Sequence, residues 1–139
     1  MGDAAKVRTG GCLCGRIRYE ARGEPLYQGH CYCEDCRKAS GSGFIPFMGF
    51  AASAVTFSGE TCRHSCKAAN GNDAVRNFCP VCGGLVFGGI VGQHEQHTLY
   101  AGSLDDPSTF QPAIAIFTRG APAWAVIPPQ LTVVERAAG

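Results

Sequence analysis

Three cysteines within six residues form the densest group of reactive side chains in the sequence: Cys31, Cys33 and Cys36. Thiolate sulfur is a soft ligand that zinc binds at about 2.3 Å, and three protein ligands with an exchangeable fourth are typical of catalytic zinc. A disulfide within the Cys-x-Cys pair would be strained, because its side chains point to opposite sides of an extended backbone. The spacing therefore predicts a zinc site with one open position.

Four more cysteines form two pairs that lie far apart in the sequence, Cys12 with Cys14 and Cys79 with Cys82. A Cys-x-x-Cys pair followed by glycine, here Gly83, is typical of a zinc knuckle. Two ligands do not complete a tetrahedral site, so the first pair is the natural other half. A redox pair of the thioredoxin type is the alternative for the second pair, but no strand-helix-strand pattern surrounds it. The sequence predicts a closed structural zinc site that contributes to folding.

The remaining candidate ligands are two cysteines and four histidines: Cys62, Cys66, His30, His64, His94 and His97. On a strand, the two cysteines would share one face, and either could complete the central triplet. The alternative is that both are small buried apolar residues. The first two histidines are either a fourth ligand or partly exposed imidazoles without a metal. The last two lie in a polar stretch and are expected to be solvated.

Composition favours one small globular domain of 139 residues, with 45% apolar residues and no apolar run of membrane-spanning length. The first residues lack the apolar segment of a secretory signal, so we expect a cytoplasmic protein with reduced thiols, a view that the odd count of nine cysteines supports. Twelve basic residues face eleven acidic ones without long runs of like charge. This balance gives little support to nucleic-acid or membrane binding.

Nineteen glycines and eight prolines interrupt every apolar run, which predicts an all-β protein. Predicted strands are Arg16–Ala21, Leu26–Tyr32, Phe44–Phe50, Val55–Ser58, Thr61–Cys66, Ala74–Phe78, Leu85–Gly89, His97–Ala101 and Ala113–Thr118. A short helix is predicted at Glu34–Ser40, and a brief one within Asp105–Phe110. We expect a single domain over residues 8–127, followed by a loosely held tail over residues 128–139.

Four motifs in this order closely resemble the glutathione-dependent formaldehyde-activating family, also called the centromere protein V family: Gly11–Gly15, Cys31–Ser42, Phe78–Gly83 and Gly102–Pro107. The resemblance runs from about Gly10 to Trp124. It implies an Mss4-like β-tent of stacked antiparallel sheets with a short helical turn, stabilised by zinc. It also implies two zinc ions per chain, one on each of the cysteine groups described above. The activity that it implies joins formaldehyde to glutathione.

The sequence departs from the family pattern at two positions. Tyr32 stands where the family usually has histidine, and Ala115 stands where a second histidine often occurs. Cys62 and Cys66 are additions that the family motif does not predict. The basic tail of the chromosome-associated relatives is missing. Because of these departures, membership of the family does not by itself establish the activity.

As an enzyme, the protein would be a carbon–sulfur lyase that acts on a small thiol such as glutathione and a small aldehyde. The open zinc would deprotonate the thiol or polarise the aldehyde. Arg37 and Lys38 would contact the carboxylates of the thiol, although a solvated turn is the alternative for both. Two other functions remain open: a non-catalytic zinc module that binds a protein partner, and a thiol-based redox or metal sensor. The sequence favours no particular oligomeric state.

Overall fold

The computed structural model describes residues 6–68 and 71–135. Residues 1–5, on which the expectation about a secretory signal rests, and residues 136–139 at the end of the expected tail lie outside this part. Within it, no helix is long and apolar enough to cross a membrane.

Strands dominate the described residues, and one α-helix, α2 (Glu34–Ser40), interrupts them. The strands are β1 (Val7–Gly11), β2 (Arg18–Arg22), β3 (Tyr27–Cys31), β4 (Ile45–Ala51), β5 (Val55–Ser58), β6 (Cys62–Lys67), β7 (Asp73–Phe78), β8 (Leu85–Gly88), β9 (Gln96–Tyr100), β10 (Ile114–Ile116) and β11 (Thr132–Val134). Four short 3-10 helices are η1 (Ala52–Ala54), η2 (Ala101–Ser103), η3 (Pro107–Thr109) and η4 (Thr118–Gly120). The predicted all-β class and both predicted helical segments are therefore confirmed.

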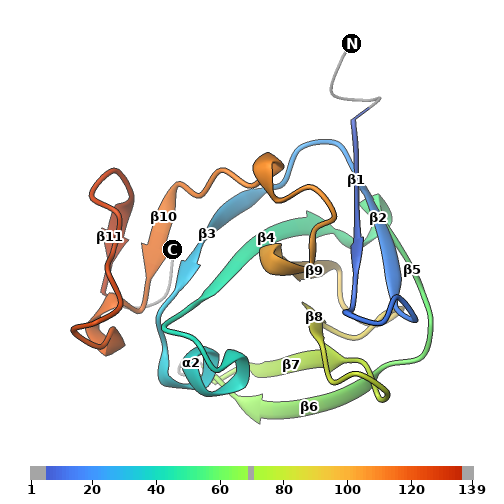
Figure 1. Cartoon of the computed structure of the whole chain (residues 1–139), viewed down its shortest axis with the longest axis horizontal. Coiled ribbons are helices and arrows are strands. Elements are labelled where there is room, and N and C mark those ends of the chain that lie inside the picture. The colour runs from blue at the N-terminus through green and yellow to red at the C-terminus, as the bar shows by residue number, and fades with distance from the viewer. Residues whose placement is uncertain (1–5, 69–70, 136–139) are drawn as a thin grey trace.

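The strands form two sheets, a small one in the order β1-β2-β5 and a large one in the order β11-β10-β3-β4-β9-β8-β7-β6. The large sheet curves strongly, so that β6 and β7 lie below β3 and β4 in Figure 1, with α2 beside their ends. This arrangement of two sheets matches the expected tent. One feature departs from it, because β10 pairs in parallel with both β3 and β11.

Helix α2 begins directly after the middle cysteine of the central triplet. The Cys33 sulfur accepts a hydrogen bond from the Cys36 amide at 3.2 Å and so caps the first turn. Glu34 and Asp35 follow in that turn, where carboxylates interact well with the helix dipole. Gly41 ends the helix in a left-handed conformation with φ of 70°. This short helix fixes the spacing of the last two cysteines of the triplet.

The main hydrophobic core lies between the two sheets and includes Tyr19, Met48, Phe50, Val86 and Leu99. Two smaller clusters lie outside it. One surrounds Cys31 and Cys36, and the other surrounds Tyr32 and Ala115. A contiguous main core with satellite clusters is usual for a domain of this size.

Two strands lie outside the nine predicted ones. The first, β1, has the sequence VRTGG, whose two glycines suggest a turn. Gly10 is needed there because an added Cβ would lie 2.4 Å from the Tyr19 hydroxyl of the neighbouring strand. The second, β11, falls in the segment expected to be loosely held, yet it pairs with β10, and Leu131 beside it is 5% exposed. The expectation of a loose segment is thus wrong for residues 131–134, and the division at residue 127 stays a prediction.

Candidate metal centres

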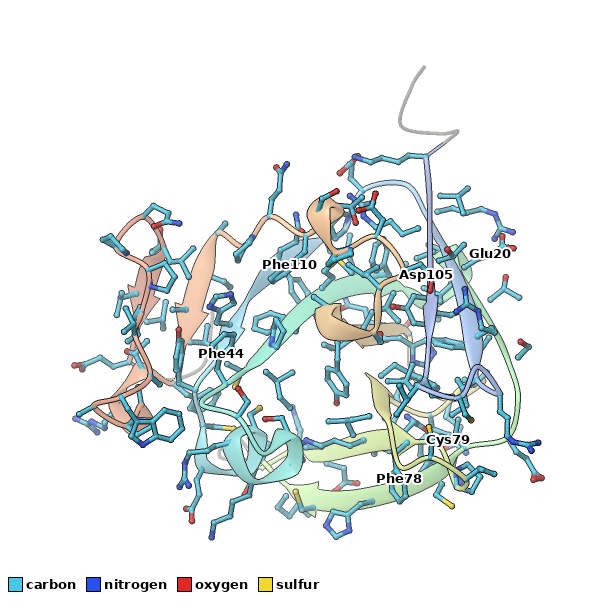
Figure 2. All side chains as sticks on the ribbon, viewed as in Figure 1. Glu20, Phe44, Phe78, Cys79, Asp105 and Phe110 are labelled. Atoms are coloured by element: carbon cyan, nitrogen blue, oxygen red, sulfur yellow. The ribbon has the colours of Figure 1, made fainter. Side chains whose placement is uncertain are left out.

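Four cysteine sulfurs from two distant turns meet in one cluster, formed by Cys12, Cys14, Cys79 and Cys82. All four Sγ atoms lie within 4.8 Å of one another. Cys14 Sγ lies 3.7 Å from both Cys12 Sγ and Cys79 Sγ. Four sulfurs at about 2.3 Å from a central zinc would be separated by about 3.8 Å, so the donor type and the spacing both fit a tetrahedral zinc. Figure 2 places Cys79 below the hairpin of β1 and β2.

Backbone amides point at the sulfurs of this cluster, as expected for a zinc knuckle. The amides of Val81 and Cys82 donate to Cys79 Sγ at 3.3 and 3.4 Å, and Gly83 after them has φ of 77°. Burial raises the pKa of Cys12, but the Ile17 amide and the neighbouring thiols outweigh it and lower this pKa to about 6. The local backbone therefore favours thiolate, which is the form that binds metal.

The central triplet forms a second cluster, in which the sulfurs of Cys31, Cys33 and Cys36 lie within 4.8 Å of one another. Strand β3 ends at the first of these residues, and the first turn of α2 holds the other two. No other histidine, cysteine or carboxylate of residues 6–68 and 71–135 belongs to this group. Three soft donors without a fourth protein ligand fit a zinc site that keeps an exchangeable position.

The close contact between these three thiols makes their pKa values differ. Contacts with Cys31 and Cys36 lower the pKa of Cys33, and contacts with Cys33 and Cys36 raise the pKa of Cys31. One sulfur thus ionises readily, whereas three thiolates this close would repel one another. A bound cation removes this repulsion, and the cluster is well suited to one for that reason.

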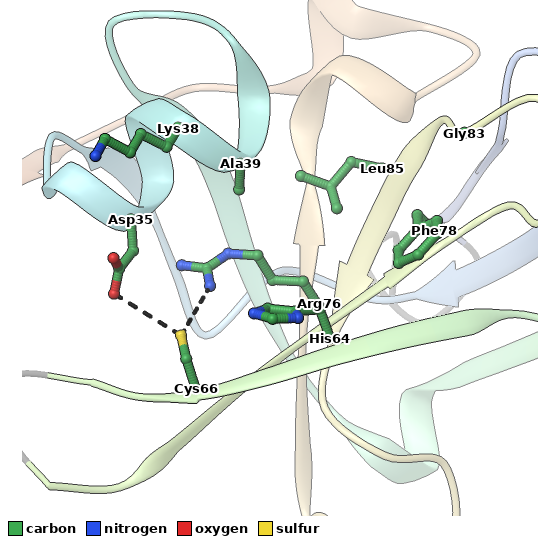
Figure 3. Close-up of a pocket in the computed structure, with 9 residues that line it drawn as sticks. All are labelled: Asp35, Lys38, Ala39, His64, Cys66, Arg76, Phe78, Gly83 and Leu85. Atoms are coloured by element: carbon green, nitrogen blue, oxygen red, sulfur yellow. Dashed lines mark hydrogen bonds between the residues drawn. The ribbon is translucent and has the colours of Figure 1, made fainter.

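Two clefts open beside the second cluster. The larger one, about 540 Å³, contains Cys31 and Cys36 in its wall together with Thr98, Tyr100 and Arg76, and we call it the sulfur cleft. The smaller one, about 380 Å³, lies between α2 and β6, and we call it the α2 cleft. Figure 3 shows its main polar side chains: Asp35, Lys38, His64, Cys66 and Arg76. Arg76 lines both clefts, and each has the volume of a small-molecule site.

Sequence reasoning missed Arg76, and it also missed Tyr100. The Arg76 Nη2 lies 3.8 Å from Cys36 Sγ, and its Nη1 lies 3.6 Å from Cys66 Sγ. Burial opposes its charge, but the contact with Cys36 outweighs this effect and raises the Arg76 pKa. No sequence pattern marks Arg76, because the order of the strands in the large sheet brings it to the sulfurs.

None of the residues considered as a fourth ligand of the second cluster belongs to that cluster in the structure. Cys66 reaches the edge of the second cluster through Arg76, while Cys62 is exposed, so neither is the buried apolar residue that was the alternative. His64 is exposed and lines the α2 cleft. His30 is buried, stacked on Phe44 with ring centres 4.2 Å apart, and it lies outside the cluster. The Phe44 side chain is labelled in Figure 2.

His97 corrects a sequence expectation. It lies in β9 and is only 2% exposed, although its surroundings in the sequence suggested a solvated turn. Its Nδ1 lies 3.1 Å from the Gly88 carbonyl oxygen, and its ring packs edge-on against Phe57 and Phe87. Burial lowers its pKa. His94 is exposed, as expected, and its Nδ1 accepts the Ile90 amide at 2.7 Å.

Of the two predicted substrate contacts, Lys38 lines one of the two clefts and Arg37 lines neither. Lys38 lines the α2 cleft, and its Nζ forms an exposed ion pair with Glu34 at 3.0 Å. Arg37 lies on the same helix but outside the linings of the sulfur cleft and the α2 cleft. Such an exposed ion pair is weak, so the ammonium of Lys38 is free to meet another anion.

The two departures from the family pattern lie together in space. Tyr32 and Ala115 are both fully buried and pack in one apolar cluster with Leu131. The Tyr32 hydroxyl donates to the Val126 carbonyl oxygen at 3.4 Å and contacts His30 Nδ1 at 3.3 Å. Neither residue lines the sulfur cleft or the α2 cleft. In this chain both positions therefore serve packing.

Comparison with solved structures gives a crystal structure of a Rhodobacter sphaeroides protein, with 19% sequence identity and a TM-score of 0.52. The match covers 73% of this chain and 93% of the other one, and it bears on the fold alone. Comparison with curated proteins gives no significant match. The sequence model described as glutathione-dependent formaldehyde-activating enzyme matches residues 7–120, which include all seven cysteines of the two clusters. The chain therefore belongs to the glutathione-dependent formaldehyde-activating enzyme family.

Proposed function

We propose that this protein binds two zinc ions and forms a carbon–sulfur bond between a small thiol, such as glutathione, and formaldehyde or a related small aldehyde. The four-cysteine cluster would hold the structural zinc, and the three-cysteine cluster would hold the second. One observation carries the proposal: three cysteine sulfurs lie together without a fourth protein ligand among the described residues, and two of them, Cys31 and Cys36, line a cleft large enough for a small molecule. Membership of the family supports the choice of thiol and aldehyde.

A zinc ion at Cys31, Cys33 and Cys36 would supply a position at which a substrate thiol loses its proton near neutral pH. The thiol sulfur then attacks the aldehyde carbon, and a carbon–sulfur bond forms while the carbonyl electron pair moves to oxygen. That oxygen must take up one proton to give the hydroxymethyl product. The protein has to hold the thiol, orient the aldehyde and stabilise the charge on this oxygen.

Tyr100 is well placed to assist at the oxygen. Its side chain packs against the hydrophobic cluster that contains Cys31 and Cys36, and it lines the sulfur cleft. Burial raises its pKa, so the hydroxyl stays protonated at neutral pH and can donate a hydrogen bond to a developing alkoxide. Gly88 leaves room for this hydroxyl, since an added Cβ would lie 3.1 Å from it. The role of Tyr100 does not depend on a histidine at position 32 or 115.

The test is the consumption of formaldehyde by zinc-loaded protein in the presence of glutathione. We expect the initial rate to exceed that of the uncatalysed mixture, and we expect this excess to disappear in Cys33→Ser. The matched control is Cys62→Ser, which changes an exposed cysteine outside both clusters and should behave like wild type. Wild-type protein that leaves the uncatalysed rate unchanged would contradict the proposed reaction.

A further inference from the structure

Arg76 lies on β7 of the large sheet and lines both clefts. In register, it lies between His64 of β6 and Gly88 of β8, and Gly88 in turn lies opposite Thr98 of β9. Residues opposite one another in antiparallel strands share a face, so these four positions form one row across the sheet. Because Gly88 has no side chain, the Arg76 guanidinium borders open space on both sides.

The two ends of the Arg76 guanidinium contact sulfur, Nη1 at Cys66 and Nη2 at Cys36. Within the part of the chain that the structure describes, no carboxylate lies within 4.0 Å of it. By contrast, the buried Arg8 and the exposed Arg18 both pair with carboxylates. A guanidinium presents its donors in a planar fork that matches a carboxylate, and a half-buried cation gains most from such a partner. Arg76 is thus a cation that lacks its best partner.

The two ends of Arg76 face different groups. Nη2 points to Cys36, a predicted metal ligand, whereas Nη1 points to Cys66, which belongs to neither cluster. Figure 3 shows the guanidinium between Cys66 and helix α2, with Lys38 and Asp35 on that helix. Lys38 lines the α2 cleft as a second cation, while Asp35, whose Oδ2 lies 3.8 Å from Cys66 Sγ, would repel a carboxylate there and would favour a nearby ammonium group.

We propose that Arg76 binds a carboxylate of the substrate thiol in the α2 cleft, so that the site selects thiols that carry a carboxylate over simple thiols. This inference rests on the proposed function, because it assumes that the thiol sulfur lies at the second cluster. The thiol sulfur would then lie beside Cys36, and the carboxylate would lie at Arg76 in the α2 cleft. The separation of these two places determines how far apart sulfur and carboxylate must be in the substrate. Arg76 replaces Arg37 as the arginine expected to contact it.

The test compares wild type, Arg76→Gln and a control, Arg63→Gln, all loaded with zinc. Arg63 is exposed on the neighbouring strand and lines neither the sulfur cleft nor the α2 cleft. Calorimetric affinities are measured for glutathione, for its diester, in which both carboxylates are blocked, and for 2-mercaptoethanol. We expect Arg76→Gln to weaken glutathione binding at least tenfold and to change diester and 2-mercaptoethanol binding less than twofold. Arg63→Gln should match wild type for all three.

Each contrary outcome has a distinct meaning. Unchanged glutathione affinity in Arg76→Gln overturns the inference and leaves the proposed function standing. Equal weakening of all three ligands also overturns it, because Arg76 would then act through the thiolates. If Arg76→Gln loses zinc, the wild-type comparison of glutathione with its diester decides, and equal affinities overturn the inference. Wild-type protein that binds none of the three thiols overturns the proposed function as well.

Discussion

At the scale of single residues, local backbone geometry explains why the sulfurs of this protein suit a metal. Amides of the Cys79–Gly83 turn point at Cys79, and the Cys36 amide points at Cys33. These contacts favour thiolate before any metal arrives, so less of the binding energy is spent on ordering the ligands. Histidines contribute differently, because two of the four are buried in aromatic surroundings rather than placed at a metal.

A pH effect follows from the burial of His97. Its pKa is lowered in the folded state, so the unfolded chain binds more protons. The stability that depends on neutral His97 is present above its unfolded pKa, near 6.5, and is lost as the pH falls below that value. We expect the fall in Tm between about pH 7.5 and about pH 5.5 to be smaller in His97→Gln than in wild type. Thermal unfolding at both pH values measures it.

His64→Gln is the matched control for this prediction. His64 is exposed on β6 and is not among the groups that lower the pKa of His97, so its variant should keep the pH dependence of wild type. An equal fall in Tm for wild type and His97→Gln would show that His97 does not carry the effect.

At the scale of elements, the four-cysteine cluster joins two hairpins that share no strand pairing. Cys12 and Cys14 lie between β1 and β2 of the small sheet, and Cys79 and Cys82 lie between β7 and β8 of the large sheet. A metal there would link the two sheets at the edge of the main core. The three-cysteine cluster, in contrast, lies where β3 passes into α2. Losing a metal from the second site leaves the link between the sheets intact.

Two matched variants test this difference between the sites. Cys82 and Cys33 are both half-buried, and each is changed to serine. Serine at position 33 keeps the cap of α2, since serine is a good N-cap residue. We expect Cys82→Ser to lose at least about 3 kcal/mol of stability, or roughly 10 °C in Tm, because structural zinc contributes directly to folding. Cys33→Ser should lose one zinc with a change below about 1 kcal/mol.

Metal analysis and thermal unfolding of both variants give the answer. Equal destabilisation by Cys82→Ser and Cys33→Ser would contradict the division into a structural and a functional site.

At the scale of the whole molecule, the curvature of the large sheet assembles the candidate site. It brings Arg76 of β7 to Cys36 of α2, and it places Tyr100 of β9 in the same cleft. Cysteine spacing predicted both clusters, because metal ligation leaves a local signature in the sequence. Arg76 and Tyr100 leave no such signature, since only the order of the strands in the sheet makes them neighbours of the sulfurs.

The same reason explains the errors about strands and buried residues. Strand β1 was missed because its two glycines look like a turn. Gly10 is required by the close approach of Tyr19, and Gly11 by that of the Ile17 carbonyl group. Strand β11 was missed because its three residues are too short to show alternation, and its partner β10 lies 15 residues or more before it. His97 looked solvated because the polar residues before it in the sequence are not its neighbours in the fold. Long-range packing decided each of these positions.

The central claim is that the second cluster holds a zinc whose fourth position receives the substrate thiol. X-ray absorption at the zinc edge, with and without millimolar glutathione, tests it most directly. Without glutathione we predict two zinc ions, one with the four sulfurs of its cluster and one with three sulfurs and an oxygen. With glutathione, the second ion should exchange its oxygen for a fourth sulfur. A sulfur count that stays the same in saturating glutathione, or a protein that binds only one zinc, would contradict the account.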